Sequence, residues 1–83
     1  MDAHDVAEQT EAYIRNHFAI NPRDDRFGPR VELFAGGYVD SVGLAELLEF
    51  IQDQFGVVIP DEDLLSDDFA TIEGIALIVC RLT

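Results

Sequence analysis

The 83-residue sequence has no lysine, no tryptophan and a single cysteine, Cys80. One cysteine excludes an internal disulfide framework and any metal site built from several thiolates. No apolar run approaches the ~18–20 residues that a membrane-spanning helix needs. The first residues, MDAHDVAEQTEAYI, lack the basic region and apolar stretch of a secretory signal. We therefore expect a cytoplasmic protein that does not span a membrane.

Positive charge is also scarce, because 17 Asp and Glu residues stand against 5 arginines and give a net charge of −12. This balance repels phosphate backbones and anionic lipid, so it argues against nucleic acid and membrane partners and favours a protein with a basic patch. Ten acidic residues and no arginine lie between Asp40 and Glu73. With 48% hydrophobic residues the chain is too apolar for a disordered acidic tail. We expect one domain over residues 1–83, and a monomer.

Helical periodicity marks three long segments, and none alternates like a half-buried strand. We expect helices over about 3–18, 41–55 and 71–82, and a short helix over 61–65. The second segment has the clearest apolar stripe, formed by Leu44, Leu47, Leu48, Ile51 and Phe55. Its opposite face carries Val42, Ala45, Glu46, Glu49 and Asp53. The predicted fold is all-α, an acyl-carrier-like bundle of three longer helices and one short one.

Two connections are expected to be irregular. The long loop over residues 21–39 contains two prolines, three glycines and three of the five arginines. We interpret these arginines as solvated side chains that balance nearby acidic residues. Its apolar residues are expected to anchor it on the core: Phe27, Val31, Leu33 and Phe34. The apolar segment 56–60 has no strand to pair with, so we interpret it as a buried loop after a helix stop at Gly56.

Catalysis and metal binding receive little support from the residue pattern. A hydrolase would need Ser41, a histidine such as His17 and a carboxylate around a pocket, and a bundle this small offers little cleft. The acidic runs at 61–63 and 67–68 lack the alternating ligands, central glycine and terminal glutamate of a calcium loop. Cys80 lies on the apolar face of the last helix and is interpreted as a core residue.

One motif is not explained by packing. The residues GYVDSVGL place Ser41 at the start of the strongest helix, after a glycine-containing loop. A phosphate on this serine would lie beside the positive end of the helix, a favourable position for an anion. The simpler alternative is that Ser41 only caps the helix. The acidic residues along the same outer face favour a modification site.

The chain resembles carrier proteins of the acyl, aminoacyl or peptidyl type. The resemblance covers essentially the whole chain and rests on DSVGLAELLEFIQDQFGVVIPDEDL followed by FATIEGIALIV. It implies that Ser41, preceded by Asp40, carries 4′-phosphopantetheine through a phosphodiester bond, and that the thiol of this arm holds cargo as a thioester. It also implies a protein without catalytic activity of its own. The implied partners are a phosphopantetheinyl transferase, an acyl- or aminoacyl-loading enzyme and downstream acyl-processing enzymes.

Two positions depart from the family pattern and bear on the pathway. Val42 stands where most members have leucine, and Gly43 where fatty-acid carriers have an acidic residue. The pattern is more similar to stand-alone carriers of specialised pathways, of the natural-product, polyketide or nonribosomal-peptide type. The resemblance further implies that partners contact Val42, Ala45, Glu46, Glu49 and Asp53. The alternative from a different class is an unmodified acidic helical adaptor that binds one basic protein.

Overall fold

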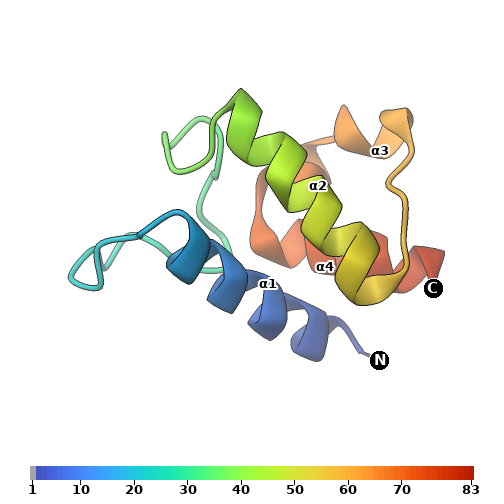
Figure 1. Cartoon of the computed structure of the whole chain (residues 1–83), viewed down its shortest axis with the longest axis horizontal. Helices are drawn as coiled ribbons and strands as arrows, with labels where there is room; N and C mark the ends of the chain where they lie inside the picture. The colour runs from blue at the N-terminus through green and yellow to red at the C-terminus, as the bar shows by residue number, and fades with distance from the viewer. Residues whose placement is uncertain (1) are drawn as a thin grey trace.

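The computed structural model describes residues 2–83, and within them it contains helices and no strand. The elements are α1 (Ala3–His17), α2 (Ser41–Phe55), α3 (Asp61–Leu64), the 3-10 helix η1 (Asp67–Ala70) and α4 (Ile72–Leu82) (Figure 1). The prediction of an all-α, acyl-carrier-like fold is confirmed. None of the described helices combines the length and apolarity needed to cross a bilayer.

The observed helix ends differ in detail from the predicted ones. α1 stops at His17, before the Asn21-Pro22 pair, because Ala19 adopts a left-handed backbone with φ 51°. Gly56 ends α2 as expected, with φ 69° and its N–H donating to the Gln52 carbonyl. α3 is one residue shorter than expected, and η1 was not predicted, because four residues are too few to show a periodicity.

The core lies between the inward faces of α1, α2 and α4. The buried core residues on these helices include Val6, Ile14, Leu47, Ile51, Phe55, Ile72, Ile75, Ala76, Ile78 and Val79. Leu44 and Leu48 are only half-buried at the edge of the α2 stripe, and Cys80 is half-buried on α4. Leu82 is 39% exposed because α4 ends there, whereas Ile78 is buried.

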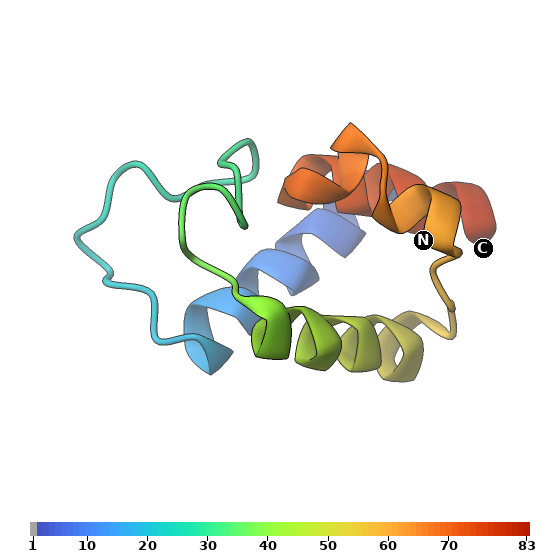
Figure 2. The same cartoon turned by 90° about the horizontal axis from the view of Figure 1, so that it is seen from above.

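The loop over residues 21–39 is docked on the bundle. Phe27 and Leu33 are buried, as expected of anchors, while Val31 and Phe34 are half-buried. The Leu33 N–H donates to the Ala70 carbonyl at 2.9 Å, and the Glu73 N–H donates to the Pro29 carbonyl at 2.8 Å. Figure 2 shows the loop reaching beyond the ends of α1 and α2 before it returns to the start of α2. These contacts fix the entry into α2.

The connection between α2 and α3 agrees only partly with the buried loop that the sequence predicts. Val57 and Ile59 are buried in the core. Val58, between them, is 70% exposed because consecutive side chains of an extended segment point in opposite directions.

Candidate modification site

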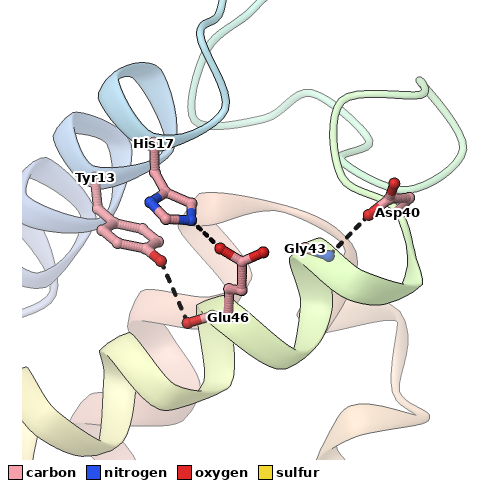
Figure 3. A network of polar contacts seen from close by, with 5 residues as sticks. All are labelled: Tyr13, His17, Asp40, Gly43 and Glu46. Carbon is pink, nitrogen blue, oxygen red and sulfur yellow. Dashed lines mark hydrogen bonds and ion pairs between the residues drawn. The ribbon is translucent and has the colours of Figure 1, made fainter.

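The start of α2 is held by Asp40 rather than by Ser41. Asp40 is the N-cap residue, and its carboxylate accepts a hydrogen bond from the Gly43 N–H at 2.8 Å (Figure 3). Its carbonyl accepts the first intrahelical bond, from the Leu44 N–H, also at 2.8 Å. Ser41 is therefore the first helical residue. The alternative in which Ser41 serves only as the cap is wrong, because Asp40 already does so.

Ser41 lies exposed at this helix end. Within residues 2–83 no hydrogen-bond partner is found for its hydroxyl. The first N–H groups of a helix have no partner inside it, and here Asp40 satisfies only that of Gly43. The N–H groups of Ser41 and Val42 therefore remain for an anion next to the Ser41 hydroxyl, where the helix dipole also favours negative charge. The local structure thus fits a phosphodiester on Ser41.

Gly43 leaves room for the ring of Phe18 beside this serine. A Cβ atom at Gly43 would lie 2.8 Å from Cε1 of Phe18 and 3.1 Å from Cγ1 of Val39. The glycine therefore receives the ring of Phe18, which follows the last residue of α1. This packing gives a physical reason for a glycine in the first turn of α2.

The outward residues of α2 separate into two groups. Val42 is 69% exposed, and Ala45, Glu49 and Asp53 are also exposed. Glu46 differs from the expected outward placement, because it is half-buried and its carboxylate contacts the His17 imidazole of α1 (Figure 3). The acidic face of α2 is thus partly engaged inside the molecule.

The same region contains aromatic contacts that the sequence did not indicate. The Tyr13 ring stacks on Phe50 at 4.0 Å between centroids and on His17 at 4.8 Å. The Tyr13 hydroxyl donates to the Glu46 carbonyl at 3.3 Å. Desolvation, followed by the negative charges of Glu46 and Glu49, raises the pKa of Tyr13, so its hydroxyl stays protonated as a donor.

The contacts of His17 also bear on the hydrolase alternative. Its imidazole pairs with Glu46 and stacks on Tyr13, and no contact joins it to Ser41 within the described chain. A serine nucleophile needs a base within hydrogen-bond reach. The arrangement therefore gives that alternative no support. In residues 2–83 no cluster of three or more metal-ligating side chains is present.

Comparison with known families gives one match. The family model described as a phosphopantetheine attachment site matches residues 14–79. The matched region begins within α1, ends within α4 and includes Ser41 with all of α2. Among curated proteins, no sequence matches the chain significantly.

Proposed function

Because this chain belongs to the phosphopantetheine-attachment family, we propose that it is a discrete carrier whose 4′-phosphopantetheine is bonded to Ser41. Domains of this family are sites of covalent attachment of that cofactor, and they interact with the enzymes that modify and process them. The match does not name the attachment residue. Its assignment to Ser41 is supported by the state of the hydroxyl groups in the chain.

Ser41 is the exposed aliphatic hydroxyl that is not engaged elsewhere. Ser66, the second serine, donates to the Asp63 carbonyl at 2.7 Å. Thr10 is fully buried, and the Thr71 hydroxyl accepts the Gly74 N–H that caps α4. Thr83 donates to the Cys80 carbonyl. The free Ser41 hydroxyl at the start of α2 is the observation that carries the proposal.

The proposed modification is a transfer of phosphopantetheine from coenzyme A. The Ser41 oxygen attacks the phosphorus next to the pantetheine and forms a new P–O bond. The bond from that phosphorus to adenosine 3′,5′-bisphosphate breaks, and the serine proton passes to a base of the transferase. The chain itself contributes the exposed hydroxyl and the free N–H groups of Ser41 and Val42 beside the phosphodiester.

The modified chain would hold an acyl or aminoacyl group as a thioester and pass it between separate enzymes. We place this work in a specialised pathway in the cytoplasm, with a loading enzyme and acyl-processing enzymes as partners and no reaction catalysed by the chain itself. Docking would use the exposed residues of α2, namely Val42, Ala45, Glu49 and Asp53, which fit a partner with a basic patch. Glu46, whose carboxylate pairs with His17, borders this surface.

Intact-mass measurement after incubation with coenzyme A and a broad-specificity transferase tests the assignment. Wild type should gain one phosphopantetheine, Ser41→Ala none, and the matched control Ser66→Ala one. A modified Ser41→Ala protein, or a wild type that resists a transferase active on another carrier, would contradict it. The adaptor alternative requires only the acidic face, so it predicts an unmodified wild type that still binds a basic protein.

A further inference from the structure

We propose that the charge of His17 sets how much negative charge α2 presents, so that docking of a basic partner weakens as the pH falls. The proposal rests on the carrier function proposed above and concerns the regulation of its docking surface. It starts from the contact between the His17 imidazole at the end of α1 and the Glu46 carboxylate on α2 (Figure 3).

The contact lies in a groove between α1 and α2 that is rich in carboxylates. Its lining includes Tyr13, His17, Glu46, Glu49, Phe50 and Asp53, and no arginine. The titratable groups of α2 in this groove are all acidic, and α1 contributes Tyr13 and His17. Among the residues that line this groove, His17 is the one whose side chain can carry a positive charge.

The aromatic neighbours of His17 hold its ring toward α2. One face of the imidazole stacks on Tyr13 at 4.8 Å between centroids, and the ring meets the edge of Phe18 at 5.0 Å. Phe18 is itself seated against Gly43. The His17 side chain is exposed, and these two aromatic contacts orient its ring toward α2.

The consequence follows from the charges on α2. With a neutral imidazole, the carboxylates of Glu46, Glu49 and Asp53 all contribute to the field that a basic partner meets. A protonated His17 neutralises one of the three. Electrostatic attraction mainly accelerates encounter, so the association rate should fall when His17 becomes charged.

The rate of Ser41 modification at low salt, with coenzyme A and a broad-specificity transferase, provides the test. The transferase has a pH dependence of its own, so the measured quantity is the ratio of kcat/KM for wild type to that for His17→Gln. This ratio should fall about two- to fivefold between about pH 8 and about pH 5.5. The fall should disappear at high salt, because ions screen the charge of His17 and of the α2 carboxylates.

His4 supplies the matched control. It also lies on α1 and also pairs with a glutamate, Glu8, but its side chain is 84% exposed and it lines grooves away from α2. The ratio of wild type to His4→Gln should not change with pH. Circular dichroism checks that each variant is folded. An NMR titration of wild type gives a second measurement, in which the Glu46 carboxyl shift should follow the protonation of His17.

Two outcomes separate this inference from the proposed function. If Ser41 is modified but the wild-type to His17→Gln ratio is constant with pH, the carrier function stands and the role of His17 is wrong. If the NMR shift of Glu46 does not respond to His17, the inference is likewise overturned. If Ser41 is not modified at all, the proposed function fails first, and the NMR titration still decides whether the two side chains are coupled.

Discussion

The ring of Phe18 occupies the space that a side chain at position 43 would need, so that a Cβ on Gly43 would lie 2.8 Å from Cε1 of Phe18. The contact joins the end of α1 to the first turn of α2, two residues after Ser41. It explains why a glycine is kept inside a helix, where it costs about 1 kcal/mol relative to alanine. The contact between Phe18 and Gly43 has a direct test.

Gly43→Ala should lower the free energy of unfolding by about 1–3 kcal/mol, because the new methyl group forces Phe18 to move. The same substitution should cost clearly less in a Phe18→Ala background, where only the contact with Val39 remains. Urea denaturation of wild type, the two single variants and the double variant gives the coupling free energy between Phe18 and position 43. Equal effects of Gly43→Ala in both backgrounds would contradict the contact.

Substitutions at Asp40 should separate capping from charge. Asp40→Ala loses the cap and should cost about 1 kcal/mol, which corresponds to about 4–8 °C in Tm for a domain of this size. Asp40→Asn keeps an oxygen that accepts the Gly43 N–H, so its Tm should stay close to that of wild type. A slow modification of Asp40→Asn, at an unchanged Tm, would show that the transferase needs the carboxylate itself. A Tm equally low for both variants would contradict the capping role.

Leu47 and Leu48 form a matched pair for the orientation of α2. Leu47 is fully buried, so Leu47→Ala should cost about 2–5 kcal/mol of unfolding free energy. Leu48 is half-buried, and Leu48→Ala should cost clearly less. Chemical denaturation measures both. A larger loss at Leu48 would mean that α2 is rotated about its axis, and Glu49 and Asp53 would then no longer face outward.

The exposed acids of α2 should govern the rate at which Ser41 is modified. Glu49→Lys combined with Asp53→Lys should slow the reaction and remove much of its salt dependence, because the charged surface accelerates encounter and is screened by ions. Asp5→Lys combined with Glu8→Lys makes the same change of net charge on exposed residues of α1. If both double variants slow the reaction equally, net charge alone is responsible, and a specific docking face on α2 is refuted.

In the loop before α2, the lowered pKa of Asp24 should make the stability of the protein depend on pH. A hydrogen bond donated by the Tyr38 hydroxyl, and then one from the Arg26 N–H, lower the pKa of Asp24. A carboxyl with a lowered folded-state pKa adds stability above its unfolded value, about 4, and this is lost as the pH falls through the folded pKa. Tyr38→Phe should therefore raise the pKa of Asp24 in an NMR titration. The stability difference from wild type should shrink in acid.

A second hydrogen bond to Asp24 serves as an internal control for this titration. The Arg26 N–H bond to Asp24 is unchanged in Tyr38→Phe, so the pKa should move only part of the way back to its ordinary value. An unchanged Asp24 pKa would show that the Tyr38 hydroxyl does not bind it in solution.

The sequence by itself determined the helices, the anchors of the long loop and the candidate serine. Periodicity of three and four residues reports which positions share a helix face, and that is enough to place Leu47, Ile51 and Phe55 in the core. Helix caps can also be predicted from the sequence, because a capping residue and the backbone group that it binds lie within about four residues. Asp40 and Thr71 cap the starts of α2 and α4, and Gly56 ends α2. Ser41 stands out on the same local grounds.

Only the tertiary structure decided what borders the exposed face of α2. Periodicity gives the direction of Glu46 around its helix axis, but not the neighbouring helix that reaches it. His17 lies 29 residues earlier in the chain, and its contact with Glu46 depends on how α1 crosses α2. The ring of Phe18 on Gly43 and the stack of Tyr13 on Phe50 are further contacts between these two parts of the chain. Such contacts join side chains far apart in the sequence, so no local pattern encodes them.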